Sequence, residues 1–431
     1  MEDVHPLYAR SVSDPSFVDL EAGAPGLHLV PTCALASAMS RVLGPSAGPP
    51  SGPPPFCMLY GALRGPLSLR EALCEYLNGE LARCEGYVRA SARELCVTNG
   101  CSQALDTLCS RLCRPGDVVL AERVTYFLCQ SVFEDHGLRV VPVEVTVDGI
   151  DLVDLEAKMA EHHPRMLYLI PVYQNPTGAT LPHASRRALV AIARRHACAV
   201  VADEVYQLLW FDAARLPPAP MCCYDDCAGD WPGVVSVCTF SKLVCPGLRL
   251  GWVQSRREAL VEAVGSAGFV VSGGGLNPVV AAAVCEMLRS GDLAEHVRSF
   301  RAALAAAAAE LSSALVRAFG PDVEIREPEG GFFLWAALRG SAGEALGGDS
   351  ARVVQALASE GVALKRGDLC VLREGQQTAR QAAVSARCAR AMRLCLAYCP
   401  RERMSEGVDR VHRALAALGS SPAAHSAPLD A

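Results

Sequence analysis

Two charged residues stand at the ends of apolar runs that predict buried strands. Lys242 follows the run Val234–Phe240, and Asp203 ends the run Ala199–Asp203. A lysine buried at a strand end has a lowered pKa, so its amine can act as a nucleophile and as a base. A carboxylate in such a place needs a cationic or protonated partner. Taken alone, Lys242 is better explained as a surface lysine, so its role depends on the residues around it.

Two loops carry polar residues of another kind. Gly100 and Ser102 follow the run Leu95–Thr98 at the predicted start of a helix. Free backbone N–H groups and the helix dipole at such a start favour an anion such as phosphate. A helix cap without a ligand is the simpler alternative. Asn175 lies in the turn after Met166–Tyr173, and by composition alone that turn is an ordinary one.

The positions of these residues depend on the elements around them. Short apolar runs alternate along the chain with helical patterns, of which Leu152–His162 and Ala184–His196 are examples. Continuous apolar strands separated by helices predict an α/β fold with a mostly parallel sheet covered on both faces. Such sheets bind ligands at the carboxyl ends of their strands. The predicted strands are Leu95–Thr98, Val118–Ala121, Arg139–Val145, Met166–Tyr173, Ala199–Asp203, Val234–Phe240 and Arg249–Gln254.

The pattern changes after about Ser290, where a long Ala-rich helix begins. We expect an N-terminal segment at 1–45, a large domain at 46–290 and a smaller α+β domain at 291–431. The N-terminal segment is expected to pack with the small domain, because chain termini often lie close together. Residues 44–55 predict a linker, and the tail after Leu418 predicts a frayed end. The small domain is predicted to contain strands at Gly330–Ala336, Gly361–Lys365 and Ala391–Tyr398, and a last helix near Ser405–Leu418.

Composition and charge exclude several classes of function. The 431 residues are 51% hydrophobic and 20% charged, which excludes a mainly disordered chain. The formal net charge of −6 excludes a general nucleic-acid coat, and we expect no nucleic-acid partner. No charge-free apolar run is long enough to cross a bilayer, and the acidic N-terminus lacks an apolar signal region. We therefore expect a cytoplasmic protein without membrane attachment.

Twenty cysteines are many for a chain of this kind. In a large chain without a secretory signal they are expected to be reduced, mostly buried thiols. The nearest approach to a metal-binding cluster is Cys222, Cys223 and Cys227 with Asp225 and Asp226. No second ligand pair accompanies it, so a polar loop is favoured and no metal is expected.

Several sequence motifs follow one another in order along the chain. They are YGALRG at 60–65, TNGCSQALD at 98–106, PVYQNPTG at 171–178, ADEVY at 202–206, TFSK at 239–242 with PGLRLGW at 246–252, GGFFLW at 330–335 and MRLCLAY at 392–398. In this order and spacing they resemble those of the pyridoxal-phosphate aminotransferases of class I/II, with the aspartate-aminotransferase fold (fold type I). The resemblance spans roughly residues 17–415, and the aminoadipate, kynurenine and aromatic aminotransferase branch is the most similar. It implies a mostly parallel seven-stranded sheet with helices on both faces, plus a smaller α+β domain.

The resemblance implies a role for each matching residue. Lys242 is expected to form the internal aldimine with pyridoxal 5′-phosphate and to be the base and acid of the 1,3-proton shift. Asp203 is expected to keep the pyridine nitrogen protonated, so that the ring accepts electrons. Tyr206 and Asn175 are expected to hydrogen-bond the ring O3′, and Tyr126 to stack on the ring.

The resemblance also implies the remaining contacts. Arg393 is expected to bind the substrate α-carboxylate by its planar fork, with Asn175 and Gly23 beside the substrate. Tyr60 is expected to reach the phosphate of the other subunit, which implies a homodimer with shared active sites. The residues expected at the phosphate within one chain are Ser102, Gln103 through its backbone, Thr239, Ser241 and Arg249.

The implied reaction moves an amino group from an L-amino acid to a 2-oxo acid, with glutamate and 2-oxoglutarate as one expected pair. A lyase, decarboxylase or synthase of the same fold is the alternative, since fold does not fix the reaction. A non-catalytic binding module is disfavoured, because Lys242, Asp203 and Arg393 are all present. The chain departs from the family pattern at the glycine-rich Ser272–Pro278 and at Arg373–Arg390, which looks inserted. The first could lie near the partner's phosphate or be a turn.

Overall fold

The structure is a computed structural model that describes residues 5–44, 56–373 and 379–420. The predicted linker, apart from Gly44, and residues 421–431 of the predicted frayed tail lie outside the described residues.

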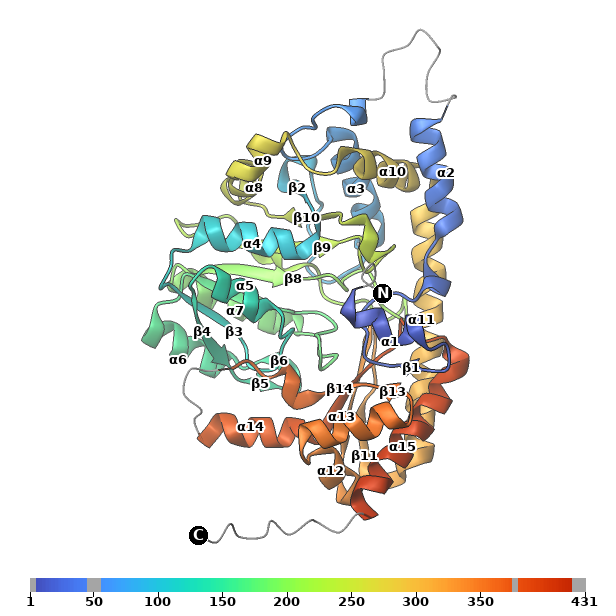
Figure 1. Cartoon of the computed structure of the whole chain (residues 1–431). Coiled ribbons are helices and arrows are strands. Elements are labelled where there is room, and N and C mark those ends of the chain that lie inside the picture. The colour runs from blue at the N-terminus through green and yellow to red at the C-terminus, as the bar shows by residue number, and fades with distance from the viewer. Residues whose placement is uncertain (1–4, 45–55, 374–378, 421–431) are drawn as a thin grey trace, which may run out of the picture.

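A seven-stranded sheet forms the centre of the larger part of the molecule (Figure 1), with the strand order β2-β10-β9-β8-β7-β3-β4. Only β10 is antiparallel to its neighbours within this sheet, so the sheet is mostly parallel, as the sequence predicts. All residues of the strands other than β4 are buried, because helices cover both faces. The strands are β2 (Leu95–Thr98), β3 (Val118–Glu122), β4 (Arg139–Val143), β7 (Met166–Leu169), β8 (Ala199–Asp203), β9 (Val234–Thr239) and β10 (Gly251–Gln254).

Helices cover the two faces with separate apolar clusters. On one face α4, α5 and α8 pack around Leu108, Phe133 and Val261. On the other face α6 and α7 contribute Leu155 and Leu189 to a second cluster. The helices around this sheet are α3 (Leu67–Glu80), α4 (Gly100–Leu112), α5 (Cys129–Asp135), α6 (Leu152–His162), α7 (His183–Arg195), α8 (Glu258–Gly265), α9 (Gly268–Gly273) and α10 (Pro278–Ser290).

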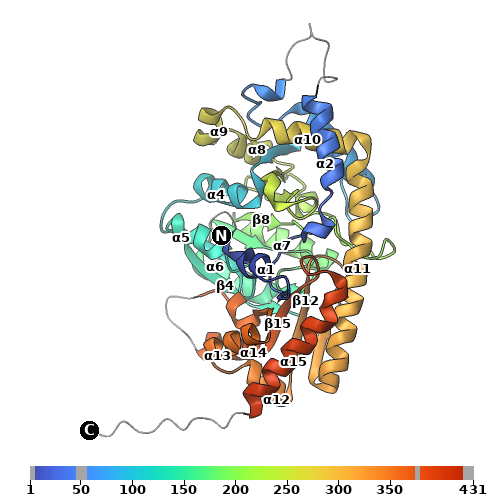
Figure 2. The same cartoon turned by 45° about the vertical axis from the view of Figure 1, so that its right-hand side comes forward.

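A smaller antiparallel sheet, with the order β11-β12-β15-β14, lies below the large one in Figure 1. Helices α12, α13 and α15 pack beside it with the long helix α11 (Figure 2). The elements are α11 (Asp292–Phe319), β11 (Val323–Arg326), β12 (Phe333–Leu338), α12 (Gly340–Leu346), α13 (Ser350–Ser359), β13 (Val362–Ala363), β14 (Lys365–Arg366), α14 (Ala379–Ala389), β15 (Ala391–Cys395) and α15 (Met404–Ser420).

The N-terminal segment contacts both parts of the molecule. Strand β1 (Val18–Asp19) pairs in parallel with β13, next to the small sheet. Helix α2 (Thr32–Leu43) packs instead along α10, beside the large sheet, while α1 (Ala9–Ser13) lies near the centre of the molecule (Figure 1). This path brings Glu21 to Arg393 on the small sheet and Gly23 to Lys242 beside the large one.

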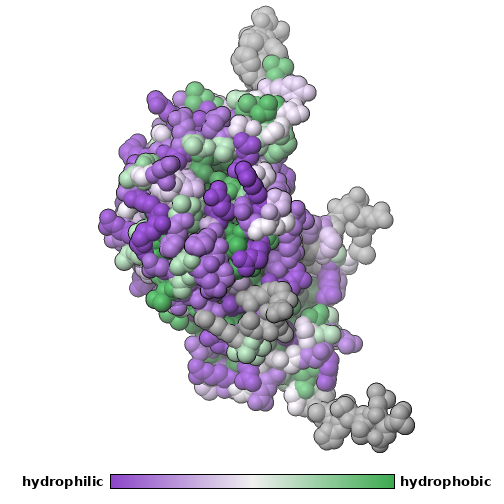
Figure 3. All heavy atoms as spheres, turned by 90° about the vertical axis from the view of Figure 1, so that its left-hand side faces the viewer, coloured by the Kyte–Doolittle hydropathy of each residue, from purple (hydrophilic) through white to green (hydrophobic). Residues whose placement is uncertain are grey.

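Helix α11 runs along most of the molecule and joins its two parts (Figure 2). Among the described residues, one helical stretch, Asp292–Asp322, is apolar and long enough to cross a membrane, with 44% of its most apolar window buried. It supplies Val297, Phe300 and Leu304 to the main apolar cluster, as the core helix of a folded domain does. The face of the molecule drawn in Figure 3 is largely hydrophilic, and its apolar areas are small.

Several predicted strand bounds differ from the structure for local reasons. The strand predicted at Met166–Tyr173 ends at Leu169, and the chain turns so that Tyr173 has a φ of 45°. The strand predicted from Arg249 begins at Gly251, because Arg249 is left-handed with a φ of 46°. The single strand predicted at Gly361–Lys365 is divided into β13 and β14, which pair in different sheets. The last strand ends at Cys395. Within the apparently inserted segment, Ala379–Ala389 form helix α14, and residues 374–378 lie outside the described residues.

Candidate active site

A cavity of about 530 Å³ lies where the carboxyl ends of the parallel strands meet the small sheet. Eleven of the thirteen residues proposed from the sequence line it, although they come from segments far apart in the chain. They are Gly23, Ser102, Tyr126, Asn175, Asp203, Tyr206, Thr239, Ser241, Lys242, Arg249 and Arg393. The cavity therefore gathers an amine, a carboxylate, two guanidinium groups and two phenols in one place.

Lys242 follows strand β9 and reaches the N-terminal segment. Its Nζ donates a 2.5 Å hydrogen bond to the backbone oxygen of Gly23, and it lies 5.8 Å from the ring centroid of Phe332. Burial lowers the pKa of Lys242, although Asp203 and two cysteines act in the opposite direction. The amine is thus deprotonated more readily than a surface lysine, as a nucleophile requires.

Asp203 is the last residue of β8 and is buried. The hydroxyl of Tyr168 donates a 2.8 Å hydrogen bond to its Oδ2. Its Oδ1 is also buried and has no hydrogen-bond partner in the described part of the chain. Burial raises the pKa of Asp203 to about 6, against the effects of Tyr168 and Lys242. One carboxylate oxygen is therefore fixed and the other is open to a proton-bearing group.

An anion-binding end of the cavity is built around the start of α4. Gly100 has a φ of +82°, and a Cβ placed there would lie 3.2 Å from Nη2 of Arg249. That guanidinium donates to the backbone oxygens of Pro246 and Asn99, at 3.2 and 3.3 Å. Glycine at this position therefore lets an arginine approach the helix start, whose free N–H groups favour an anion.

Residues after β9 complete this end of the cavity. The hydroxyl of Thr239 donates to the backbone oxygen of Leu250 at 3.1 Å and accepts a 3.0 Å hydrogen bond from the backbone N–H of Ser241. Thr239 and Ser241 are both buried on the cavity wall. Asn277 donates to the backbone oxygens of Leu248 and Arg249 and so fixes the turn that carries the arginine.

Arg393 stands on β15 of the small sheet and is buried. Its Nη1 donates to Oδ1 of Asn175 at 3.0 Å, and its Nη2 donates to the backbone oxygen of Glu21 at 2.7 Å. Its guanidinium carbon lies 4.1 Å from the ring centroid of Phe333. Its Nε is buried and has no partner among the described residues. The group is thus held by two of its five N–H donors, and the donors that remain, including that of Nε, can bind a carboxylate.

The turn that carries Asn175 is fixed by its neighbour Gln174. The Gln174 side chain donates to the backbone oxygen of Val124 at 2.7 Å and accepts from the backbone N–H of Thr177 at 2.9 Å. These bonds connect the end of β7 with the end of β3, where the loop to Tyr126 begins. Asn175 and Tyr126 are therefore set on the cavity wall by the same hydrogen-bond network.

The two phenols lie in different surroundings. The Tyr126 ring centroid is 6.2 Å from that of Phe127, and burial raises the pKa of Tyr126 to about 12. The Tyr206 ring meets Phe333 edge-on at 6.0 Å, and burial raises its pKa well above the ordinary value. Both hydroxyls therefore stay protonated near neutral pH and can donate hydrogen bonds.

Two residues proposed from the sequence do not line this cavity. Gln103 accepts a 2.9 Å hydrogen bond from the backbone N–H of Asn99 and donates to Thr107, so its side chain closes the helix start. The role predicted from the sequence concerns its backbone, which lies in the first turn of α4. Tyr60 is 87% exposed, outside the cavity of its own chain.

The structure also adds residues that sequence reasoning missed. Cys101, Glu21, Phe127 and Lys365 line the cavity. Cys101 stands between Gly100 and Ser102, so its position at the helix start could have been read from the same motif. Lys365 could not, because its nearness to Arg393 depends on how β14 and β15 pair.

The glycine-rich segment before α10 packs against the segment of Tyr60. A Cβ on Gly274 would lie 2.7 Å from the Tyr60 side chain, and one on Gly275 would lie 2.7 Å from the backbone oxygen of Ala62. Both glycines have positive φ. The glycines thus permit a close approach between these two segments.

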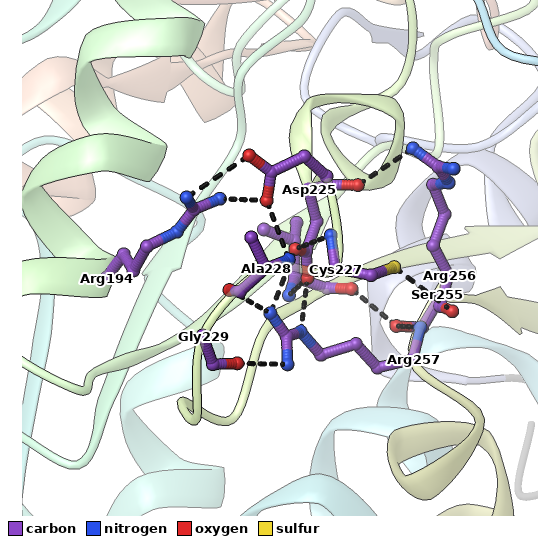
Figure 4. A network of polar contacts seen from close by, with 10 residues as sticks. Arg194, Asp225, Cys227, Ala228, Gly229, Ser255, Arg256 and Arg257 are labelled. Atoms are coloured by element: carbon purple, nitrogen blue, oxygen red, sulfur yellow. Dashed lines mark hydrogen bonds and ion pairs between the residues drawn. The ribbon is translucent and has the colours of Figure 1, made fainter.

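Cys222 and Cys223 are buried in the short 3-10 helix Met221–Tyr224, and arginine side chains hold the loop that follows, which contains Asp225 and Cys227 (Figure 4). Arg257 binds the buried carboxylate of Asp225 at 2.7 Å, and Arg194 pairs with Asp226. Within the ranges that the structure describes, no three His, Cys, Asp or Glu side chains are grouped to hold a metal ion.

Comparisons with known proteins indicate the family to which the chain belongs. A family model described as aminotransferase class I and II matches residues 51–411. The 2-aminoadipate transaminase of Thermus thermophilus is 29% identical over 406 residues, which are 94% of this chain and 91% of that protein. Aromatic-amino-acid aminotransferase 1 of Thermococcus litoralis is 24% identical over 410 residues, 93% of this chain and 88% of the other.

A solved structure is similar over nearly the whole length. It is the alpha-aminoadipate aminotransferase of Thermus thermophilus, complexed with N-(5′-phosphopyridoxyl)-L-leucine. The TM-score is 0.74 at 27% identity, over 97% of this chain and 98% of that chain. The family match covers well over half of the sequence, and the fold agrees with it. The chain therefore belongs to the aminotransferase class I and II family, enzymes of fold type I that transfer amino groups with pyridoxal phosphate.

Proposed function

We propose that this cavity holds pyridoxal phosphate on Lys242 and transfers an amino group from an L-amino acid to a 2-oxo acid. The observation that carries the proposal is the meeting of Lys242, Asp203 and Arg393 on one cavity wall. When bound, the cofactor supplies a conjugated ring that accepts the electron pair left when the substrate carbon loses its proton. The amine of Lys242 removes that proton from the α-carbon of the substrate and returns it to the carbon on the other side of the transferred nitrogen.

Asp203 and its neighbours are proposed to hold the cofactor ring. Oδ1 of Asp203 accepts a hydrogen bond from the protonated ring nitrogen, which satisfies the buried oxygen that has no partner in the described chain. Tyr206 and Asn175 donate to the phenolic oxygen, and Tyr126 covers one face of the ring. The positions of all three on the cavity wall support these roles.

The anion-binding end is proposed to hold the phosphate. Ser102, the first-turn N–H groups of α4 including that of Gln103, Thr239 and Ser241 donate hydrogen bonds to it. Arg249 supplies a guanidinium that suits two phosphate oxygens. The glycine at position 100, which leaves room for that guanidinium, supports this role.

Arg393 is proposed to bind the α-carboxylate of the substrate beside Asn175 and Gly23. Its free Nε and its two fixed Nη groups support a rigid, preorganised site. Glutamate and 2-oxoglutarate are proposed as one substrate pair. The partner donor is proposed to be aminoadipate, an aromatic amino acid or kynurenine.

A homodimer with shared active sites is proposed next. Tyr60 would donate to the phosphate of the partner subunit, and its exposure in the single chain supports this. Met58, Leu59 and Phe269 are also exposed, on or beside the segments that the glycine-rich loop brings together. Burying such apolar side chains is what stabilises a dimer. A cytoplasmic location is proposed as well, supported by twenty cysteines that carry free thiols.

The experiment for this proposal is a half-reaction without 2-oxo acid. Holoenzyme is mixed with each of the twenty amino acids, kynurenine and aminoadipate, and pyridoxamine phosphate, keto acid and ammonia are then quantified. One donor is expected to give pyridoxamine phosphate and keto acid in equal amounts, without ammonia. Keto acid and ammonia without pyridoxamine phosphate would instead assign the chain to the lyase alternative. Lys242→Ala is the inactive control.

A further inference from the structure

A second cation stands beside Arg393 on the small sheet. Lys365 on β14 is directly opposite Arg393 on β15. Side chains of opposed residues in an antiparallel pair project from the same face of the sheet, a few ångströms apart. Both residues line the cavity, so the proposed α-carboxylate site has an ammonium group next to it.

Glu21 and Phe127 hold this ammonium group in place. The Nζ of Lys365 lies 2.5 Å from Oε1 of Glu21 and 5.0 Å from the ring centroid of Phe127. The side chains of Lys365 and Glu21 are 18% and 28% exposed, so a ligand in the cavity can reach both. The backbone oxygen of Glu21 also accepts a hydrogen bond from Arg393, which fixes Glu21 beside that guanidinium group.

The residue type at this place is unusual for the chain. The sequence holds 40 lysines and arginines, and only Lys158, Lys242 and Lys365 are lysines. An ammonium on a flexible stem can move between two acceptors, whereas a guanidinium fork is set for one planar partner. A lysine therefore suits a site where the anion that binds the cation differs from one ligand to the next.

We propose that Lys365 determines specificity for the substrate side chain by binding the second carboxylate of a dicarboxylic amino acid or 2-oxo acid. When the substrate side chain is uncharged, the ammonium group of Lys365 forms its ion pair with Glu21 again. Without Glu21, an uncharged side chain would leave a partly buried ammonium without a partner, which costs free energy. The Phe127 ring offers the uncharged side chain an apolar surface at the same place. The same cavity then binds both a dicarboxylic substrate and a substrate with an uncharged side chain, one in each half-reaction.

The charge that a substrate side chain meets at this subsite comes from Lys365. Lys365 and Glu21 form an ion pair, and Arg393 is neutralised by the α-carboxylate that it is proposed to bind. The ammonium group of Lys365 is then the cation that a second carboxylate of the same ligand can reach. The inference rests on the proposed role of Arg393, so the experiment must separate the two.

The experiment compares the binding of two unreactive ligands to the holoenzyme by calorimetry. Glutarate and pentanoate have the same carbon chain, but glutarate has two carboxylates and pentanoate has one. Lys365→Met keeps the apolar stem and removes the charge, and it is expected to weaken glutarate at least tenfold and pentanoate less than twofold. Glu21→Gln frees the ammonium and is expected to tighten glutarate. Lys158→Met, whose lysine pairs with Asp154 away from the cavity, is the matched control.

Equal effects of Lys365→Met on both ligands, or no effect on glutarate, would overturn the assignment of Lys365. Weaker glutarate binding in Glu21→Gln would contradict the role given to Glu21. The proposed role of Arg393 fails separately, if Arg393→Lys leaves the binding of pentanoate unchanged. A melting temperature for each variant shows that the fold is retained.

Discussion

The Tyr168 hydroxyl donates a 2.8 Å hydrogen bond to Oδ2 of Asp203, while Oδ1 has no partner among the described residues. The carboxylate is therefore held by one oxygen and open at the other. Burial has already raised its pKa to about 6, so a protonated ring nitrogen would be a favourable partner. The site is thus preorganised for a protonated group whose N–H points at Oδ1 of Asp203.

Asp203→Asn tests this relationship directly. A neutral amide cannot stabilise a protonated ring nitrogen, so we expect the rate of the half-reaction to fall about 100-fold, as loss of a buried charged hydrogen bond predicts. The cofactor is expected to remain bound through Arg249 and Lys242. The measurement is a single-turnover rate, with Asp148→Asn as an exposed control. A rate within threefold of the unchanged protein would remove Asp203 from this role.

The stability of the cofactor-free protein is expected to depend on pH through Asp203. Its pKa is about 6 in the folded chain and 3.8 as the ordinary value, so the folded state binds the proton more tightly. The stabilisation is fully present below pH 3.8 and is lost as the pH rises to about 6. The loss is on the order of 3 kcal/mol at 1.36 kcal/mol per pKa unit.

Urea unfolding of the cofactor-free protein between pH 4 and 7 measures this effect. Burial raises the pKa of Glu204 to about 7 and of Glu122 to about 8, so these groups add slopes of the same sign at higher pH. The comparison with Asp203→Asn isolates the Asp203 contribution, because that variant lacks only its titration. Identical pH profiles for the two proteins would contradict the raised pKa.

Arg393→Lys is expected to raise KM for the amino donor more than tenfold. The lysine keeps the positive charge but loses the fork, and about 1.5–3 kcal/mol of charged hydrogen bonding goes with it. The effect on kcat should be smaller. Steady-state kinetics with a saturating 2-oxo acid measure both, and the exposed Arg339→Lys serves as control. An unchanged KM would move the α-carboxylate site elsewhere.

The sequence predicts the sheet and eleven of the residues that line the cavity, and several of these polar residues end or follow an apolar run. Asp203 ends β8 as expected, and Lys242 and Asn175 follow β9 and β7 within a few residues. The predicted bounds failed where the backbone is left-handed, at Tyr173 and Arg249, since residue type alone does not show such a conformation. Predictions that depend on the partner subunit, such as that for Tyr60, stay predictions.

Lys365 shows the limit of sequence reasoning more clearly. It is 28 residues from Arg393 in sequence, and its meeting with Arg393 and Glu21 depends on the pairing of short strands. Local patterns determine the strands, but long-range register depends on the packing of the whole small sheet. The two-residue strand β14 carries no periodic signal at all.

Gly275→Ala is expected to destabilise the protein by about 1–3 kcal/mol, because Gly275 has a φ of +83° and a Cβ there would touch the backbone of Gly61 and Ala62. Gly273→Ala is the matched control. Gly273 lies in α9, its φ is not positive, and a Cβ would meet nothing within 4 Å. Thermal unfolding of both variants is the measurement. Equal losses in the two would show that the close approach to the Tyr60 segment is unimportant.

Mixing two inactive variants tests the shared active site. If Tyr60 serves the partner's cavity, a dimer of one Lys242→Ala chain and one Tyr60→Ala chain has one doubly altered site and one intact site. Co-refolding the two at limiting cofactor is then expected to restore up to about a quarter of full activity by random pairing. If Tyr60 acts in its own chain, no intact site forms and the activity stays at the level of the separate variants.

The covalent attachment of the cofactor to Lys242 tests the account most directly. With only three lysines in the chain, a lysine-specific protease cuts after Lys158, Lys242 and Lys365. After borohydride reduction of the holoenzyme, we expect the cut at Lys242 to be lost and peptide 159–365 to carry the mass of the reduced cofactor. Reduced cofactor at Lys158 or Lys365, or none on any lysine, would contradict the account.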